Sequence, residues 1–246
     1  MTVQITVIGS SPAWPNPGGA HSGYLFESGG GRLLVDCGPG VLPRLREREP
    51  WPAIDAIAIT HFHLDHWGDL VPWVWGSFYR ISSGNGDQPP ELWVHPSGRL
   101  HLEALGARLG FPDMFERAFV LREYADGEVF TAAGFDVMPV RLPHYMLETY
   151  GFRVTAEEHT IAYSGDSAPS ERLVSLAQDV DLFICEATLE RGELDGEPRG
   201  HLSAEEAIEA FADSGAKRLV LTHRPCELST PAGIELAYDG LVLELR

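Results

Sequence analysis

Short apolar runs bounded by glycine or proline predict that the first third of the chain forms β-strands. Each run is too short for a helix, and several alternate between apolar and polar positions, as strands with one buried face do. The predicted strands cover residues 3–8, 24–27, 33–36 and 54–59. A polar loop at 82–90 leads to a further strand at 92–94, and residues 100–109 predict the first convincing helix.

The second half of the chain predicts hairpins followed by two β-to-α-to-β passages. The hairpin strands cover residues 128–131, 135–140, 150–154 and 160–163. In the final passage Ser203 and Glu206 have the spacing of a capping box, which marks the start of a helix. Gly215 ends this helix before a strand at 218–221, and the chain closes with a strand at 241–245.

This order of elements favours two mixed β-sheets between helices over a doubly wound parallel sheet, because several strands precede the first convincing helix. A chain of 246 residues can bury a large single core, and no stretch is polar or repetitive enough to mark a linker. We therefore predict one domain over residues 1–246, of the α/β (α+β) class, with four layers in the order helix, sheet, sheet, helix.

Charge and composition narrow the choice of partners. Acidic residues outnumber basic ones 36 to 18, the formal net charge is -18, and Lys217 is the only lysine, so we expect no stable nucleic-acid complex. No apolar run approaches the roughly 20 residues of a membrane span, and the N-terminus lacks a signal-peptide pattern, so we expect a cytoplasmic protein without membrane contact. Three widely spaced cysteines, Cys37, Cys185 and Cys226, predict buried free thiols instead of a disulfide framework.

The densest chemical signal is a cluster of three histidines and an aspartate directly behind the apolar run at 54–59. Its ligand residues are His61, His63, Asp65 and His66. Imidazole is the commonest metal-binding side chain, and alternate residues of an extended segment point the same way, so His61 and His63 can bind one ion. Asp65 and His66 then face a second ion. The sequence therefore predicts a metal site at the end of a buried strand.

Three further apolar runs end in a potential ligand, at His144, Asp166 and His223. Together with the first cluster they supply seven groups at strand ends. This arrangement resembles the metallo-β-lactamase fold, and specifically its ribonuclease-Z-like phosphodiesterase branch, over nearly the whole chain.

The resemblance implies how the seven ligands divide between two divalent ions. His61, His63 and His144 would hold one ion, Asp65, His66 and His223 the other, and Asp166 would bridge them. True β-lactamases of the family have a cysteine at the position of Asp166, so an aspartate here favours a two-metal hydrolase that does not cleave β-lactams. Zn²⁺ suits these donors first, while Mn²⁺ and Fe²⁺ also accept them. The bound ions would leave a small positive charge, which matches a phosphodiester.

The same resemblance identifies Glu186 and His201 as a carboxylate-oriented histidine acid that protonates the leaving oxygen of a phosphodiester. Asp65 is the remaining candidate catalytic residue. The family usually has a hydroxyl residue next to this histidine, and Leu202 departs from that pattern. The plain alternative is that Glu186 is a strand-end acid and His201 a helix N-terminal residue. The resemblance further implies that Asp36 orients His61 or His66 without touching metal.

Transfer-RNA processing enzymes of this branch carry a long arm between the positions of His144 and Asp166, whereas only 21 residues separate the two here. The chain resembles the compact armless members, some of which are atypical bacterial cyclic-nucleotide phosphodiesterases. This implies hydrolysis of a small phosphodiester, such as 3′,5′-cAMP or cGMP, to the 5′-monophosphate. A lactone or ester hydrolase is the alternative. A tRNA 3′-processing endonuclease and a noncatalytic metal-binding sensor rank lower.

The aromatic-rich segment from Trp67 to Tyr79 leaves directly from the metal cluster. Aromatic side chains of this kind pack cores, stack on nucleobases and form subunit interfaces. The segment is therefore compatible with core packing, with substrate contact and with a homodimer interface, and the sequence does not choose among them.

Overall fold

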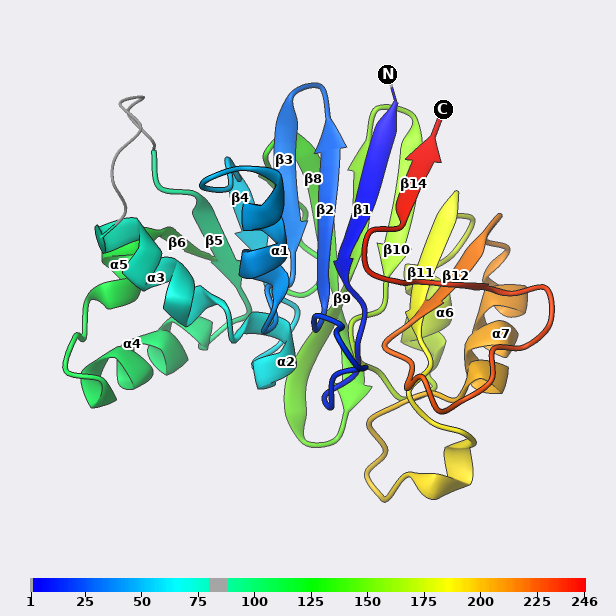
Figure 1. Ribbon diagram of the computed structural model, residues 1–246. Helices are drawn as coiled ribbons and strands as arrows, with labels where there is room; N and C mark the ends of the chain where they lie inside the picture. The colour runs from blue at the N-terminus through cyan, green and yellow to red at the C-terminus, as the bar shows by residue number, and fades with distance from the viewer. Residues whose placement is uncertain (1, 80–87) are drawn as a thin grey trace.

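Two seven-stranded β-sheets pack face to face, and helices cover their outer faces, in the computed structural model, which describes residues 2–79 and 88–246 (Figure 1). The predicted loop at 82–90 lies mostly outside the described residues. The two sheets enclose one apolar core, and each sheet has a second core beneath its helices. These layers confirm the predicted fold class.

The N-terminal sheet is mixed, with strand order β14-β1-β2-β3-β4-β5-β6. Its strands are β1 (Val3–Gly9), β2 (Gly23–Ser28), β3 (Gly31–Val35), β4 (Ala56–Ala58), β5 (Glu91–Val94), β6 (Val120–Glu123) and β14 (Val242–Leu245). Neighbours from β14 to β3 are antiparallel, and those from β3 to β6 are parallel. Because β14 pairs with β1, the two termini lie side by side (Figure 1).

The second sheet is also mixed, with strand order β13-β12-β11-β10-β9-β8-β7. Its strands are β7 (Phe130–Ala132), β8 (Phe135–His144), β9 (Leu147–Ala156), β10 (His159–Tyr163), β11 (Leu182–Glu186), β12 (Leu219–Thr222) and β13 (Glu235–Leu236). The first four form an antiparallel meander, and β10 to β13 are parallel. The parallel part corresponds to the predicted β-to-α-to-β passages.

Helices fill the two outer layers. The first sheet carries α1 (Val41–Arg48), α2 (Leu64–Trp67), α3 (Leu70–Tyr79), α4 (Gly98–Arg108) and α5 (Met114–Ala118); the second carries α6 (Glu171–Leu176) and α7 (Ala204–Ser214), with a short 3₁₀ helix η1 (Gly192–Leu194). In β2, Tyr24 and Phe26 face the core between the sheets while Leu25 faces the helices, as the two-residue period of a strand requires. Ser203 and Glu206 form the predicted capping box at the start of α7.

The predicted strands are present within a few residues, but α1, α2, α3, α5, β6 and β13 were not predicted. Proline lies within the first turns of α1 and α3, where helices tolerate it, although it reads as a breaker in a sequence. Gly76 of α3 also lowers helix propensity, yet a side chain there would collide with the Trp51 ring. Tertiary packing thus decides these elements.

The cysteine prediction is correct for two of the three residues. Cys37 and Cys185 are buried free thiols, but Cys226 is exposed, two residues beyond the buried Arg224. Within the described ranges, no helix is both long and apolar enough to cross a bilayer.

Candidate metal centre

The seven predicted ligands converge at one edge of the two packed sheets. His61 and His63 lie between β4 and α2, and α2 itself carries Asp65 and His66. The second sheet supplies the others: His144 is the last residue of β8, Asp166 follows β10, and His223 follows β12. The strand ends at which the sequence places these residues therefore meet at one location in the fold.

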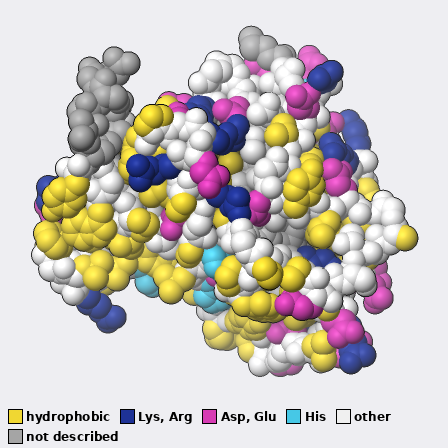
Figure 2. All heavy atoms as spheres, in the orientation of Figure 1, with side chains coloured by type: hydrophobic (Ala, Val, Ile, Leu, Met, Phe, Trp, Pro, Cys, Tyr) yellow, Lys and Arg dark blue, Asp and Glu magenta, His cyan; other side chains and the backbone are white. Residues whose placement is uncertain are grey.

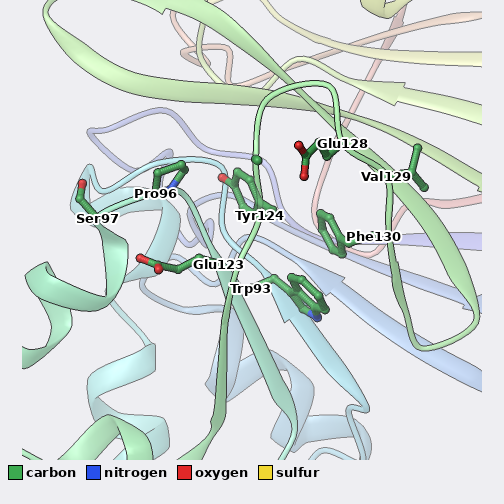
Figure 3. Close-up of a pocket in the computed structure, with 9 residues that line it drawn as sticks. Trp93, Pro96, Ser97, Glu123, Tyr124, Glu128, Val129 and Phe130 are labelled. Atoms are coloured by element: carbon green, nitrogen blue, oxygen red, sulfur yellow. The ribbon is translucent and has the colours of Figure 1, made fainter.

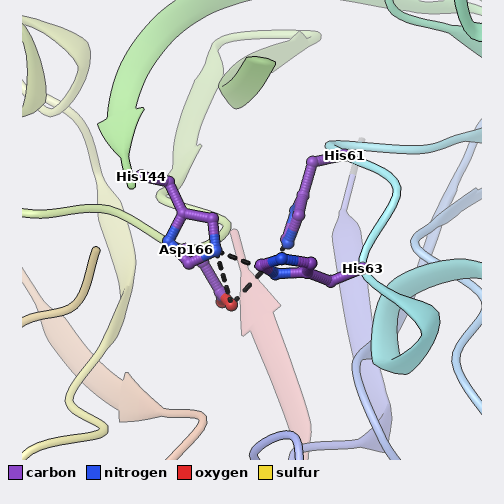
Figure 4. Close-up of side chains that lie close together, drawn as sticks. All are labelled: His61, His63, His144 and Asp166. Carbon is purple, nitrogen blue, oxygen red and sulfur yellow. Dashed lines mark hydrogen bonds and ion pairs between the residues drawn. The ribbon is translucent and has the colours of Figure 1, made fainter. Parts of the chain in front are cut away.

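The first group consists of His61, His63, His144 and Asp166, and their ligand atoms lie within 4.8 Å of one another (Figure 4). His144 Nε2 is 2.9 Å from His63 Nδ1. Asp166 Oδ2 is 3.8 Å from His61 Nε2 and 3.9 Å from His144 Nε2. Three imidazoles and one carboxylate oxygen therefore surround a common point.

The second group consists of Asp65, His66, Asp166 and His223, and all four side chains are buried. His223 Nε2 lies 3.1 Å from Asp65 Oδ2, and His66 Nε2 lies 3.3 Å from Asp166 Oδ1. Asp166 thus directs Oδ2 to the first group and Oδ1 to the second, which is the arrangement a bridging carboxylate requires.

Hydrogen bonds on the outer side of the rings fix which imidazole nitrogens face the centre. His66 Nδ1 donates to Asp36 Oδ2 at 2.7 Å, and His144 Nδ1 donates to the Gly200 carbonyl at 2.6 Å. His223 Nδ1 lies 2.8 Å from the Thr188 hydroxyl. A neutral imidazole that donates through Nδ1 presents an unprotonated Nε2. Lone pairs therefore face carboxylate oxygens across the centre, which suits a cation between them.

Buried polar atoms without hydrogen-bond partners also indicate that the site binds cations. Among the described residues, His61 Nε2, His66 Nε2 and Asp166 Oδ1 are buried without a hydrogen-bond partner. Buried polar atoms in proteins normally have partners, so three such atoms pointing at one place mark a ligand site. Imidazole and carboxylate donors are those that divalent transition metals accept. The described residues thus fit two metal ions.

Charge at the centre is strongly biased toward cation binding. Burial opposes ionisation of Asp166, but His223 and His66 outweigh it and hold the pKa of this carboxyl well below its usual range. Burial lowers the pKa of His61 far below its ordinary value, and the neighbouring His66 adds to this effect. Asp166 therefore stays ionised while His61 is neutral, as metal ligands must be. Burial disfavours a charged His66, but the carboxylates of Asp166, Asp36 and Asp65 outweigh it and raise the pKa of His66 well above its ordinary value, so this ring gives up a proton when it binds a metal ion.

Asp36 is wholly buried behind the centre. Of its two predicted partners, His61 and His66, it contacts His66. It accepts hydrogen bonds from His66 Nδ1, from Thr60 N at 2.8 Å and from Tyr163 OH at 3.0 Å.

Two residues of the centre have left-handed backbone conformations: Asp36, with a φ of 59°, and His223, with a φ of 54°. Non-glycine residues rarely adopt this conformation, and such strain concentrates at functional sites.

Glu186 and His201 form the predicted pair beside the centre. His201 Nδ1 is 2.9 Å from Glu186 Oε1, and the His201 ring lies 4.9 Å from the His144 ring. Burial disfavours a charged His201, but the Glu186 carboxylate outweighs it and raises the pKa of His201 to about 9. Leu202, the departure from the family pattern, is buried in the core under α7, and the hydroxyl group stands one residue later, at the N-cap Ser203.

Thr188 is a functional residue that the sequence analysis missed. Its hydroxyl donates to Glu186 Oε2 at 2.7 Å and accepts from His223 Nδ1 at 2.8 Å. It therefore connects the acid pair to a metal ligand. The available signal was its position two residues after Glu186, at the end of β11.

Replacing Thr188 by valine is expected to lower metal affinity or turnover by about 10- to 100-fold, because a group that orients a metal ligand typically has an effect of that size. Valine keeps the shape but leaves His223 Nδ1 without its acceptor. Metal titration followed by spectroscopy measures the effect. Thr131→Val, at an exposed hydroxyl on β7 that donates to Asp136 Oδ1, is the matched control. Equal metal affinity and turnover in the two variants would contradict the orienting role.

The aromatic segment after the centre is mostly core. Trp67 and Trp73 are buried, and Trp75 and Phe78 pack against the same cluster under the N-terminal sheet. Of the aromatic side chains in this segment, only Tyr79 is largely exposed, at 77%. These positions favour the core interpretation for most of the segment.

A cavity of about 400 Å³ lies apart from the centre, between β5, β6 and β7 (Figure 3). Trp93 and Phe130 form part of its wall, and their rings stack on each other at 4.2 Å. None of its lining residues belongs to either ligand group. The chemistry therefore points to the centre and not to this cavity.

Comparison with known proteins agrees with this geometry. Residues 31–224 match the family model described as "Beta-lactamase superfamily domain". The chain is 30% identical to the "Probable metallo-hydrolase YhfI" of Bacillus subtilis, over 91% of this chain and 87% of that one. It is 29% identical to the ribonuclease Z of Mycolicibacterium paratuberculosis, over 90% of this chain and 85% of that one.

Two solved structures show the same architecture. The crystal structure of YhfI from Bacillus subtilis matches with a TM-score of 0.83 at 27% identity, over 98% of this chain and 99% of that one. The short form of human tRNase Z matches with a TM-score of 0.75 at 27% identity, over 98% of each chain. The likeness therefore extends over nearly the whole chain.

Proposed function

The chain belongs to the β-lactamase superfamily and is a metal-dependent hydrolase, and from this premise we propose that it cleaves a small phosphodiester, most favourably a 3′,5′-cyclic nucleotide to the 5′-monophosphate. The observation that carries the proposal is the Glu186–His201 pair, whose donor lies beside two candidate metal positions.

The two groups of side chains would each hold one metal ion. His61, His63 and His144 would hold one ion, and Asp65, His66 and His223 the other, with Asp166 contributing one oxygen to each. Zn²⁺ fits a donor set rich in histidine best, with Mn²⁺ and Fe²⁺ as alternatives. Two bound divalent ions supply a water of lowered pKa and stabilise negative charge on phosphoryl oxygens.

His201 completes the chemistry from the protein side. Its Nδ1 is held by Glu186, so Nε2 is the nitrogen available to a substrate. The Glu186 carboxylate raises the pKa of the ring and so favours its protonated form, which can donate a proton to a departing alkoxide oxygen. Glu186 is itself held by Ser167 N at 2.8 Å and by Thr188, so the donor has a fixed direction. A carboxylate-held acid is useful to a phosphodiesterase, whereas a lactone hydrolase does not require one.

Short connections between His144 and Asp166 favour a small substrate over RNA. The turn between β8 and β9 contains Tyr145 and Met146, and the turn between β9 and β10 contains Glu157 and Glu158. No arm is present between His144 and Asp166, a stretch that the structure describes in full. With a net charge of -18, the surface also lacks the counter-charge that a long polyanion needs.

The test is to incubate metal-replete protein with 3′,5′-cAMP, a 2′,3′-cyclic nucleotide, bis(p-nitrophenyl) phosphate and a homoserine lactone, using Asp166→Ala as the blank. We expect Asp166-dependent conversion of cAMP to AMP. Turnover of the nitrophenyl diester alone would support phosphodiesterase activity but exclude a cyclic nucleotide as the substrate. Turnover of the lactone alone would replace the proposal with ester hydrolysis.

A further inference from the structure

An aromatic side chain stands at the mouth of the metal centre without a role in the chemistry described above. Tyr145 forms the turn between β8 and β9, directly after the ligand His144. Its ring lies 4.8 Å from the His144 ring and 5.6 Å from the His201 ring. The side chain is 41% exposed, so part of it faces solvent beside the proton donor.

Several contacts hold this ring in one position. Tyr145 OH donates to Asp195 Oδ1 at 3.2 Å, and Tyr145 N donates to the Arg199 carbonyl at 2.9 Å. Asp195 Oδ2 in turn accepts from Gly200 N at 2.7 Å and from His201 N at 3.0 Å. One carboxylate therefore fixes both the tyrosine ring and the backbone of the proposed acid.

The backbone around Tyr145 has an unfavourable conformation that surrounding contacts stabilise. Tyr145 has a φ of 49°, a left-handed conformation that is unfavourable for a large side chain. A Cβ at Gly200 would collide with the Tyr145 ring, so the loop that carries His201 can pack here only with glycine at that position. Strain of this kind persists where surrounding contacts determine it, and it is common at ligand-binding positions.

We propose that the Tyr145 ring is the surface on which the nucleobase of the substrate stacks, which makes Tyr145 a specificity-determining residue. The inference rests on the proposed function. The metal ligands face the phosphate and His201 faces the leaving oxygen, so the sugar and its base extend from the side of His201, where Tyr145 lies. A rigid aromatic face binds a base with little loss of conformational entropy.

Neighbouring residues extend the apolar rim. Met146, the next residue in the turn, is 88% exposed, and Leu64, between His63 and Asp65 in the chain, is 66% exposed. Figure 2 shows histidine side chains reaching the surface with hydrophobic side chains around them. Exposed apolar side chains thus adjoin ligand residues in the chain of a protein that is strongly acidic, which suits an uncharged base.

The experiment measures equilibrium binding of AMP and of base-free ribose 5-phosphate to the metal-replete protein by isothermal titration calorimetry. We expect the wild type to bind AMP about tenfold more tightly than ribose 5-phosphate, a factor within the range for one stacked base. Tyr145→Ala should abolish this preference and leave ribose 5-phosphate affinity unchanged. Tyr145→Phe keeps the ring and should keep the preference, and Tyr79→Ala, at an exposed tyrosine on α3, is the control.

Three results would overturn the inference: equal affinity of the wild type for the two ligands, an unchanged preference in Tyr145→Ala, or a loss in Tyr145→Phe as large as in Tyr145→Ala. The last would assign the effect to the Asp195 hydrogen bond and not to stacking. Failure of the proposed function is a different observation, namely absence of cAMP turnover by the metal-replete wild type. Binding of AMP needs no turnover, so the two failures are distinguishable.

Discussion

Replacing Asp166 by asparagine is expected to remove metal from both positions of the centre and to lower cAMP turnover by at least about a thousandfold. Asp166 presents Oδ2 to His61 and His144 and Oδ1 to His66, and it is the one carboxylate shared by both ligand groups. Asparagine is neutral and has a single oxygen, so it cannot serve both groups. Metal stabilisation of the reacting group amounts to several kcal/mol, and each ~1.4 kcal/mol is a factor of ten in rate.

Metal content by mass spectrometry and steady-state kinetics on the same preparations check this expectation. Asp181→Asn is the matched control, because Asp181 accepts from Thr160 N at the opposite end of β10, away from the centre. That variant should retain both metals and full turnover. An Asp166→Asn protein that binds two metal ions and keeps turnover within about tenfold of the wild type would refute the bridging role.

The strands and the ligands were predictable because both are encoded locally. Each strand is a short apolar run with turn residues at its ends, and His61, His144 and His223 each come directly after such a run. Strand ends at one edge of a sheet lie close together, so the position of a ligand in the sequence also indicates its position in the fold. The strand-end positions indicated candidate ligands, and the resemblance to a known family assigned these seven side chains, spread over 163 sequence positions, to one centre.

The helices and the supporting contacts were harder to predict because they depend on distant parts of the chain. The proline in α1 and the Gly76–Trp51 packing in α3 are acceptable only within the folded layers. Thr188 reaches His223 across 35 positions, and Asp195 reaches Tyr145 across 50. No local pattern marks such pairs, because a single threonine or aspartate in a loop is common and gains its role only from its neighbours in space.

Replacing His201 by alanine is expected to lower turnover of 3′,5′-cAMP by about 10²- to 10⁴-fold, the range for a lost general acid, while both metals stay bound. His201 belongs to neither of the two groups that contain Asp166; it lies in a third group with Glu186 and His223, and its Nδ1 is bonded to Glu186. The 3′-oxygen of a nucleotide leaves as a strongly basic alkoxide and needs a proton. p-Nitrophenolate is a stable anion that leaves without one.

The two leaving groups therefore separate an acid role from a structural one. For bis(p-nitrophenyl) phosphate, His201→Ala should lose less than about tenfold, and the gap between the two substrates is the signature of proton donation. His159→Ala, at a histidine on β10 that contacts Asp181 at 3.7 Å, should behave as the wild type with both substrates. Equal losses on both substrates would show that His201 acts by holding the site together. Unchanged cAMP turnover in a metal-replete His201→Ala protein would exclude the histidine from the reaction.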